Sequence, residues 1–466
     1  MESSLGDSLV RLLGANSVLP VVDGNVDGRT PQVVVRPRDR VQISEFLSWA
    51  SSEKVSVLPR GGGTRMGLGN VPRSADVVLD LSRLDRVVDY QPADMTATVE
   101  AGVTLASLQE RLAPGGEFVP LESALPGRST VGGTLSVGAG GPLAQAYGLP
   151  REWLIGISVL SPLGVATKAG GKVVKNVTGY DLNKLYTGSL GTLGVIVEAS
   201  FKLLPIDPES GALLVSFPSL LDSVLAGRKL VRSPAGPLGY HGMTFGVFRR
   251  LQDSIQAASQ GLGLGDTDAA LSLAFYSGRA KATGRRMGEA AALLLSEGAT
   301  AVQRVEGPAA QGLLRWIGDV PSEISPRSVL VMRLSVQPQS AARASVECGE
   351  VTLSGGKPDQ IADPGFGAIR LFWPTPTDVP SAGGFVPGVR AAGLAQQQPI
   401  LDAINRTQQV AKKYGGSAVV EHCPLHVKGQ IDVWGDAPDS MAVMRRLKDK
   451  FDPGGMLNPG RFLGGI

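Results

Sequence analysis

The feature that most constrains this chain is a glycine-rich loop directly after an apolar, β-type run. The run VSVL covers 55–58, and the loop PRGGGTRMGLGN at 59–70 carries glycine at 61, 62, 63, 67 and 69. Glycine permits positive φ and a close approach of the backbone to a ligand, so successive N–H groups can converge on an anion. The pattern therefore predicts a phosphate-binding loop at the end of a strand.

The two common glycine codes for nucleotide phosphates do not fit this loop. A dinucleotide fingerprint that starts at Gly61 needs glycine at the sixth position, where Met66 stands. A Walker A loop needs Ser or Thr after Gly-Lys, but Val173 and Pro358 follow the Gly-Lys pairs of this chain. Taken alone, the loop is explained equally well as a simple turn.

Two further glycine clusters strengthen the phosphate interpretation. They are GRSTVGGTLSVGAGG at 127–141 and GSLGTLG at 188–194. Three such loops, each at the end of a β-like run, predict a long ligand held along its length, as a pyrophosphate-bridged dinucleotide would be. The third cluster leads into an alternating strand. Its expected faces are Val195, Val197, Ala199, Phe201 and Leu203 on one side, and Ile196, Glu198, Ser200 and Lys202 on the other.

Several stretches together resemble the FAD-binding domain of the p-cresol methylhydroxylase (PCMH) and vanillyl-alcohol oxidase superfamily. They are PRGGGT at 59–64, VGGTLSVGAGG at 131–141, YGLPREWLIG at 147–156 and GKVVKNVTGYDLNKLYTGSLGTLGVIVEASFKLLP at 171–205. The stretch KDKFDPGGMLNPGRF at 448–462 resembles the C-terminal segment with which this family returns to the flavin domain. Within the superfamily, the nearest likeness is to the E-type FAD-binding subunit of glycolate oxidase.

The resemblance implies an α+β fold with a two-lobed PCMH-type FAD-binding domain, an α+β cap domain for the substrate and a C-terminal return segment. The expected divisions are an N-terminal segment 1–29, the FAD domain 30–205, the cap 206–415 and the closing segment 416–466. Local patterns add helices that begin after Asp39 and Thr104, each with apolar residues at helical spacing. Gly- and Pro-rich stretches at 232–240, 355–366 and 375–391 are expected to be loops, boundaries or lids.

The resemblance also implies FAD as the cofactor and names its contacts. The first loop would wrap the pyrophosphate, the second would line the pyrophosphate and ring, and the third would border the adenine and flavin. Some members of the superfamily attach FAD covalently through Cys or His in the first or second loop. Here the first loop has Thr64 and Arg65, and no Cys or His stands near the second loop, so the FAD is expected to be noncovalent. The expected contacts are Arg60, Gly61, Gly62, Gly63, Thr64, Gly67, Pro126, Thr130, Gly132, Gly133, Ser136, Gly138, Tyr147, Gly148, Gly191, Val195, Ile196, Asn458 and Arg461. Tyr180 is interpreted either as a neighbour of the isoalloxazine or as a core tyrosine.

Candidates for substrate chemistry are fewer. The H-x-G-D-G-N-x-H segment of the D-type partner subunit is absent. His422 follows Glu421 in a pair that resembles a family element near the substrate, so it is the candidate general base, with a satisfied polar histidine as the alternative. Arg370 on the IRLFWP strand is the candidate carboxylate clamp. Pro424 breaks the helical spacing of His422 and His426, so no metal site is predicted.

Composition restricts partners and location. The two cysteines, Cys348 and Cys423, are too few for an iron–sulfur cluster, so any such relay is expected on another chain. A net charge of +3 without a basic block predicts no nucleic-acid partner. No signal peptide and no run of about 18 apolar residues stands out, so a cytoplasmic protein is expected, at most peripheral to the inner face of the membrane through a partner.

Three functions stay open from the sequence. The first is an FAD-binding subunit of a glycolate oxidase-type complex, which oxidises a small 2-hydroxy acid beside D-type flavoprotein and iron–sulfur subunits. The second is an FAD-binding assembly or electron-relay subunit without its own substrate site. The third is a stand-alone FAD-linked lactate or sugar oxidoreductase.

Overall fold

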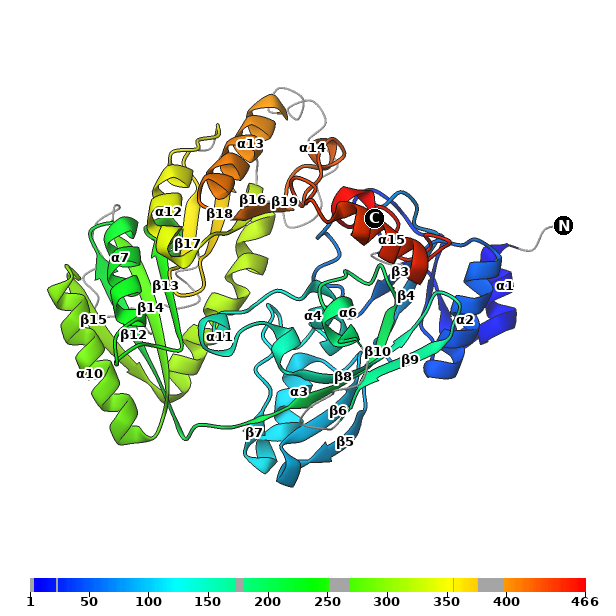
Figure 1. Cartoon of the computed structure of the whole chain (residues 1–466), viewed down its shortest axis with the longest axis horizontal. Helices are drawn as coiled ribbons and strands as arrows, with labels where there is room; N and C mark the ends of the chain where they lie inside the picture. Colours follow the sequence, from blue (N-terminus) through cyan, green and yellow to red (C-terminus); the bar gives the residue numbers. More distant parts are fainter. Residues whose placement is uncertain (1–3, 22–23, 172–179, 251–268, 355, 376–396) are drawn as a thin grey trace. The chain divides into compact units, whose positions relative to one another are not determined.

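The computed structural model describes residues 4–21, 24–171, 180–250, 269–354, 356–375 and 397–466 (Figure 1). The chain forms two compact units. Unit 1 contains Met1–Gly141, Leu149–Ile206 and Asp436–Ile466, and unit 2 contains Pro142–Gly148 and Asp207–Gly435. The expected closing segment began at 416, whereas the strand Ser417–His422 pairs within the sheet of unit 2.

The first lobe of unit 1 is a small, mainly parallel sheet covered by helices. Asp39 caps the second helix by accepting a hydrogen bond from the Gln42 N–H, as predicted. The apolar side chains Ile43, Phe46 and Leu47 are fully buried against the strands. In sheet order the strands are β1 (Val18–Leu19), β2 (Val33–Val35), β4 (Val77–Asp80) and β3 (Val57–Arg60), and the helices are α1 (Leu5–Leu13) and α2 (Arg40–Ser52).

The second lobe of unit 1 is a five-stranded antiparallel sheet. Thr104 caps its first helix through the Ser107 N–H, again as predicted. In sheet order the strands are β5 (Val87–Gln91), β6 (Thr96–Glu100), β10 (Val195–Lys202), β8 (Leu154–Leu160) and β9 (Ala166–Gly170). The remaining elements are α3 (Leu105–Leu112), α4 (Val131–Val137), α6 (Leu182–Tyr186), α15 (Met441–Phe451) and the strand pair β7 (Glu117–Phe118) and β11 (Leu204–Pro205).

The alternation predicted for β10 is wrong at one point. The register against β8 shifts between Ile196 and Glu198, which makes a β-bulge. Val195 and Val197 therefore pack into the core of the first lobe, whereas Phe201 packs into the core of the second. A strand without a bulge would have kept all three on one face.

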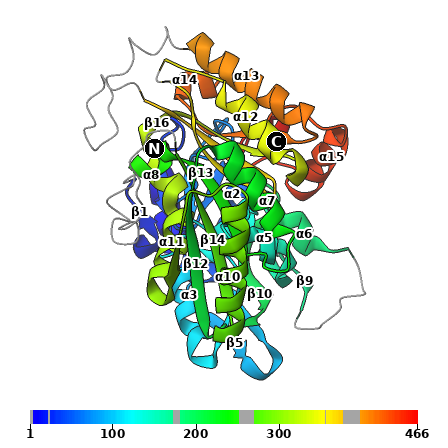
Figure 2. The same ribbon diagram turned by 90° about the vertical axis from the view of Figure 1, so that its left-hand side faces the viewer.

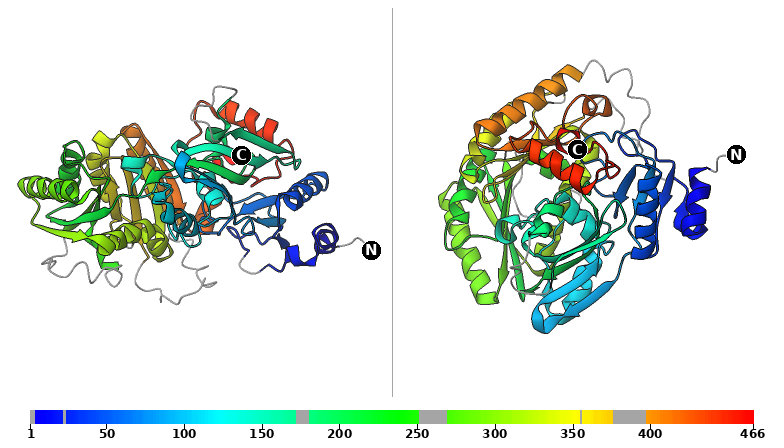
Figure 3. Two further views of the ribbon diagram at one scale, coloured as in Figure 1. Left: turned by 90° about the horizontal axis from the view of Figure 1, so that it is seen from below. Right: turned by 45° about the vertical axis from the view of Figure 1, so that its right-hand side comes forward.

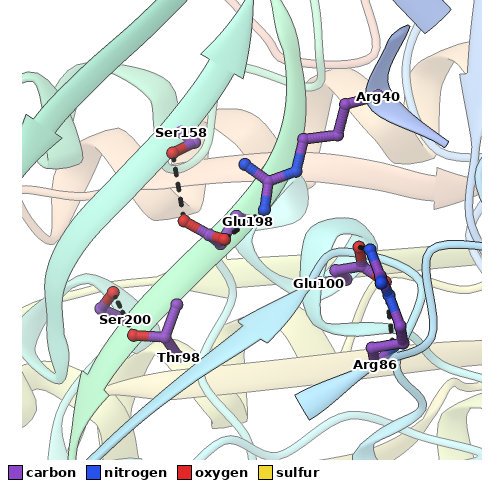
Figure 4. A network of polar contacts seen from close by, with 7 residues as sticks. All are labelled: Arg40, Arg86, Thr98, Glu100, Ser158, Glu198 and Ser200. Atoms are coloured by element: carbon purple, nitrogen blue, oxygen red, sulfur yellow. Dashed lines mark hydrogen bonds and ion pairs between the residues drawn. The ribbon is translucent and has the colours of Figure 1, made fainter. Parts of the chain in front are cut away.

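Polar side chains reinforce the second-lobe sheet and tie it to the first lobe (Figure 4). Glu198 of β10 forms an ion pair with Arg40 of α2 and accepts a hydrogen bond from Ser158. Within the sheet, the hydroxyls of Thr98 and Ser200 lie 2.8 Å apart. The two lobes of unit 1 are thus joined by a partly buried charge pair that only this strand order creates.

Unit 2 is built on an eight-stranded antiparallel sheet. The order of its strands is far from their order in the chain, so residues from 209 to 422 meet in one layer. In sheet order they are β15 (Ala301–Glu306), β12 (Glu209–Phe217), β14 (Ala270–Gly278), β13 (Gly239–Thr244), β17 (Asp359–Asp363), β18 (Ala368–Pro374), β16 (Ser328–Ser335) and β19 (Ser417–His422).

Helices cover both faces of this sheet. On one face lie α7 (Leu220–Val231), α10 (Ala280–Ser296), α12 (Ala341–Gly349) and α13 (Gln397–Lys413); Figure 2 shows α7 and α10 against the strands. On the other lie α5 (Ala144–Tyr147), α8 (Phe245–Arg250) and α11 (Gly307–Ile324), and α14 (Leu425–Lys428) follows β19. Among the described residues, no helix has the length and apolarity needed to span a bilayer.

Two predicted loops of unit 2 contain strands. Residues 355–366 include β17, which lies in the middle of the sheet, and 232–240 contain the start of β13. The Gly and Pro that mark these stretches flank short strands whose pairing comes from distant segments. The third predicted loop, 375–391, lies outside the described residues from 376 onward.

Candidate functional site

The first glycine loop joins the parallel neighbours β3 and β4 of unit 1. No hydrogen bond of the described residues uses the backbone N–H of Gly61, Gly62 or Gly63. A Cβ added at Gly61 would lie 2.0 Å from the Thr130 hydroxyl oxygen, and one at Gly62 would lie 1.6 Å from the Arg128 carbonyl oxygen. At Gly61 and Gly62 the loop is therefore packed so closely that only glycine fits, while the amide groups stay available to an anion.

The side chains of Arg60 and Thr64, at the base of this loop, bind other side chains of the protein. The Arg60 guanidinium pairs with Asp80 at 2.8 Å, which links the ends of β3 and β4. The Thr64 hydroxyl lies 2.9 Å from the Ser129 hydroxyl, which in turn donates to the Ala124 carbonyl. Both predicted contacts, Arg60 and Thr64, lie at the loop, and both already have protein partners.

The second glycine cluster is different at α4, because the amides of its glycines in and directly after that helix are satisfied internally. The N–H of Gly132 donates to the Ala101 carbonyl, that of Gly133 to the Thr130 hydroxyl, and that of Gly138 to the Thr134 carbonyl. A Cβ at Gly132 would lie 2.8 Å from the Ala101 Cβ. These glycines allow α4 to pack closely. Of the other predicted contacts here, Pro126 and Ser136 accept from backbone amides of Ala106 and Leu190 through their carbonyls.

The third glycine cluster again leaves amides available. Gly191 has φ of 67°, and the described residues make no hydrogen bond to its N–H or to that of Leu193. The cluster leads into β10, where Val195 and Ile196 pair with β8, whereas pairing with β6 begins only at Glu198. The first and third clusters thus leave glycine amides available, which Gly132, Gly133 and Gly138 of the second cluster do not.

Two C-terminal residues contact these loops. The buried Asn458 donates from Nδ2 to the Leu190 carbonyl at 2.7 Å, and its Oδ1 has no hydrogen-bond partner among the described residues. The buried Arg461 guanidinium donates to the carbonyls of Met66 and Leu68. Burial lowers the pKa of Arg461 to about 10.

The residues expected beside the flavin ring do not all lie in unit 1. Tyr147 and Gly148 belong to unit 2, where Tyr147 packs against the apolar core beside α11. Tyr180 is 93% exposed, so its interpretation as a core tyrosine is wrong. The preceding residues 172–179 lie outside the described residues. Gly67 lies in the first loop, with open space where a Cβ would stand.

Unit 2 carries a row of charged side chains on one face of its sheet. Arg333 of β16 lies directly opposite Arg370 of β18, and the Glu421 carboxylate accepts from both, from the Arg370 Nε at 2.8 Å and from the Arg333 Nε at 3.1 Å. Like charges opposite each other destabilise a sheet, so Glu421 compensates the two cations. The row is His241, Asp363, Arg370, Arg333, Glu421 and His422, taken in order from β13, β17, β18, β16 and β19.

A β-bulge aims the last two members of the row. Val331 pairs with His422 and Met332 with Val420, which leaves Glu421 as the extra residue of β19. Opposed residues share a face, so His422 turns to the side of Val331, the side on which Glu421 meets Arg370. His422 is exposed. Without the bulge, Glu421 and His422 would point to opposite faces.

The other end of the row is buried. His241, 6% exposed, donates from Nε2 to the Pro142 carbonyl at 2.8 Å, because a carbonyl can only accept. Burial lowers the pKa of His241, against the attraction of Asp363, which raises it. Burial likewise raises the pKa of Asp363, whose carboxylate accepts from the Gly365 and Phe366 amides. The sequence analysis missed Asp363 and Arg333, since only the register of distant strands brings them into the row.

Comparison with known protein families identifies two matching domains. Residues 31–170 match the FAD binding domain, and residues 386–462 match the C-terminal domain of FAD linked oxidases. These matches confirm the predicted FAD-binding domain and FAD as the cofactor. The unpaired amides of the first and third loops fit this cofactor, because its pyrophosphate is an anion that backbone N–H groups bind well.

Curated relatives are similar mainly over the first half of the chain. D-2-hydroxyglutarate dehydrogenase of Xanthomonas citri pv. viticola is 34% identical over 189 residues, which are 41% of this chain and 40% of the relative. Glycolate oxidase subunit GlcD of Bacillus subtilis is 34% identical over 193 residues, 41% of each chain. An FAD-linked oxidoreductase of Mycobacterium tuberculosis is 25% identical over 93% of this chain and 91% of its own. The first two matches thus span about two fifths of those relatives.

Solved structures confirm the fold. p-Cresol methylhydroxylase with substrate bound superposes with a TM-score of 0.71 at 16% identity, over 98% of this chain and 95% of that one. Alkyldihydroxyacetonephosphate synthase superposes with a TM-score of 0.63 at 16% identity, over 93% of this chain and 78% of that one. The predicted PCMH-type α+β fold is therefore confirmed.

Proposed function

We propose that this chain, which carries the FAD-binding and C-terminal domains of the FAD-linked oxidases, oxidises a small 2-hydroxy acid as the FAD-binding subunit of a glycolate oxidase-type complex. The single observation that carries the proposal is the charged row of unit 2, where Arg370, Arg333 and His422 share one sheet face. The relatives named above support the substrate class, because 2-hydroxyglutarate and glycolate are both 2-hydroxy acids.

The row offers the two functions that such a substrate needs. A guanidinium binds a carboxylate through two parallel N–H donors, and Arg370 is held in a fixed orientation by Glu421. His422 is exposed on the same face and can accept the hydroxyl proton. Loss of this proton from the hydroxyl oxygen, and of a hydride from the carbon that bears the hydroxyl, turns the alcohol into a ketone or aldehyde. When bound, FAD supplies the ring that accepts the hydride.

The cofactor would be held without a covalent bond. In our proposal the amides of Gly61, Gly62 and Gly63 bind the pyrophosphate, and the amides of Gly191 and Leu193 bind a further part of the same molecule. No side chain of the first loop is a nucleophile of the kind that covalent flavin attachment needs. Electrons would then leave to an iron–sulfur protein on another chain, with a D-type flavoprotein beside it.

A specific observation favours the second candidate, a relay subunit without its own substrate site. Glu421 already binds the guanidinium groups of both Arg370 and Arg333, so a substrate carboxylate has to compete with an internal one. In this candidate function the row only stabilises the sheet, and the substrate is oxidised on the D-type chain.

Anaerobic flavin reduction distinguishes the two candidates. The purified chain is reconstituted with FAD, and glycolate, D-lactate and D-2-hydroxyglutarate are added while the oxidised flavin band is followed. Bleaching by one of them in the wild-type chain, lost in the Arg370→Met variant with an unchanged oxidised spectrum, supports the first candidate. A band that persists with every acid, and bleaches only with D-type and iron–sulfur chains present, supports the relay subunit.

A further inference from the structure

We infer that three C-terminal side chains, Lys448, Asn458 and Arg461, form a clip that orients the amides of the first and third glycine loops for the pyrophosphate of FAD. We call these three residues the C-terminal clip. The inference depends on FAD binding and not on the proposed substrate. All the contacts lie within unit 1, where Figure 3 shows the red C-terminal segment next to the blue N-terminal lobe.

The clip holds the first loop through Arg461. Its guanidinium donates to the carbonyls of Met66 and Leu68, the latter at 2.6 Å. Its own carbonyl accepts from the Asn70 amide at 2.9 Å, and a Cβ at Gly69 would lie 2.7 Å from that oxygen. One buried residue therefore fixes three points of the loop backbone, at Met66, Leu68 and Asn70.

The clip holds the third loop through the other two residues. Asn458 donates to the Leu190 carbonyl at 2.7 Å. Lys448, 6% exposed, donates to the Thr192 carbonyl at 2.8 Å and pairs with Asp452 at 2.6 Å. A buried lysine is costly unless it is paired and hydrogen-bonded, and here it has both kinds of partner.

These contacts determine which way the loop amides face. In a trans peptide the carbonyl and the following N–H point in opposite directions, and the described residues contain no cis peptide. Each carbonyl that the clip binds therefore turns the next N–H away from the clip. The N–H groups so turned include those of Gly69, Gly191 and Leu193, none of which has a hydrogen-bond partner among the described residues.

The clip also joins loops from different sheets. The first loop leaves the four-stranded sheet at β3, and the third enters the five-stranded sheet at β10. A single segment that binds both fixes their separation, which a ligand spanning both loops has to match. By linkage, a ligand that binds the oriented loops must also stabilise the docked clip.

The test compares Arg461→Met with Arg461→Lys and with a matched control, Arg445→Met. Arg445 is exposed on α15, so its substitution removes the same charge without touching the loops. FAD and riboflavin, which lacks the pyrophosphate, are titrated into each apoprotein by flavin fluorescence. Loss of charged hydrogen bonds to two loop carbonyls predicts a roughly 10- to 100-fold weaker FAD affinity in Arg461→Met, and a smaller loss in Arg461→Lys.

Hydrogen exchange provides the second readout and keeps the test valid if the flavin is not retained. In the Arg461→Met apoprotein, the hydrogen-bonded loop amides of Leu68 and Asn70 are expected to exchange faster, while those of β8 and β10 keep their protection. Riboflavin affinity is expected to change less than threefold, since it makes no pyrophosphate contact. Equal losses for FAD and riboflavin, or an unchanged loop exchange rate, would overturn the clip and leave Arg461 as a general packing residue. The proposed substrate chemistry would stand in either case.

Discussion

The first glycine loop of unit 1 and the charged row of unit 2 are constructed in opposite ways. The loop offers backbone N–H groups, which every residue type carries, and the sequence matters there only because Gly61 and Gly62 leave no room for a Cβ. The row offers side chains, and its ion pairs depend on the identity of Arg370, Arg333 and Glu421. One region is therefore sensitive to added volume, and the other to lost charge and to pH.

Added volume in the loop is expected to give the largest effect. In Gly62→Val the new Cβ would meet a backbone carbonyl at 1.6 Å, which no side-chain rotation relieves. We expect FAD affinity to fall by at least about a thousand-fold, because a distortion of the loop removes several amide contacts together. The matched control is Gly127→Ala, where nothing lies within 4 Å of the added Cβ. Yellow Gly62→Val protein with wild-type FAD content would disprove the backbone site.

Lost charge in the row is expected to give the next largest effect. Arg370→Met removes one partner of a partly buried, hydrogen-bonded pair and leaves Glu421 with Arg333 alone. If the row binds the substrate carboxylate, kcat/KM for the 2-hydroxy acid should fall about 100-fold, mainly through KM. FAD content should not change, because the loops lie in unit 1.

The control for this variant is Arg343→Met, which removes an exposed arginine from α12 of the same unit. Equal losses in the two variants would assign the effect to general charge. An unchanged KM in Arg370→Met would favour the relay function.

A pH series is expected to separate the two regions more finely. Burial lowers the folded-state pKa of His241 below its ordinary value of 6.5, so the folded chain binds the proton less well than the unfolded chain. The corresponding stability is present above 6.5 and is lost as the pH falls through that value towards the folded pKa. His241→Gln keeps a donor for the Pro142 carbonyl and should flatten this acid-side slope in urea unfolding at pH 5.5, 6.5 and 7.5.

Asp363 and Arg370 stay in place in both chains, so the difference between the two slopes reports the titration of His241 together with its attraction to Asp363. Backbone N–H groups do not titrate in this range, so FAD affinity should stay constant in both chains while both remain folded. An identical slope in the two chains would show that His241 does not titrate on unfolding.

Local sequence signals predicted much of unit 1 correctly. The caps Asp39 and Thr104 and the position of β10 follow from short-range spacing, and the structure confirms all three. The same signals could not show which glycine clusters have unpaired amides, because a glycine has the same sequence signal whether or not its N–H is hydrogen-bonded. In the second cluster, the amides of Val131 and Gly132 are used internally because the carbonyls of Val103 and Ala101 lie opposite the start of α4.

The charged row was predictable only in part, for a different reason. Resemblance suggested His422 and the IRLFWP strand suggested Arg370, but Arg333 and Asp363 join them through the register of five strands spread over residues 239–422. The bulges of β10 and β19 add one residue to the alternation, and a period-2 pattern has no signal for that. Long-range pairing, rather than local propensity, thus decides which side chains meet in unit 2.

The smallest expected effect tests whether side chains of the loop take part in binding at all. Thr64 was predicted to add a hydroxyl donor to the pyrophosphate, yet its hydroxyl lies 2.9 Å from that of Ser129. If the loop binds through its backbone, Thr64→Val should weaken FAD by less than about threefold, the loss of one neutral internal hydrogen bond. A fluorescence titration of the apoprotein measures this, with Ser129→Ala as the variant that removes the same bond from the other side, together with the bond from Ser129 to the Ala124 carbonyl. Equal, small losses of FAD affinity would assign the hydroxyl pair to loop packing. A much larger loss in Thr64→Val alone would mean that the Thr64 hydroxyl turns to the ligand. The loop would then recognise FAD by side chain as well as by backbone.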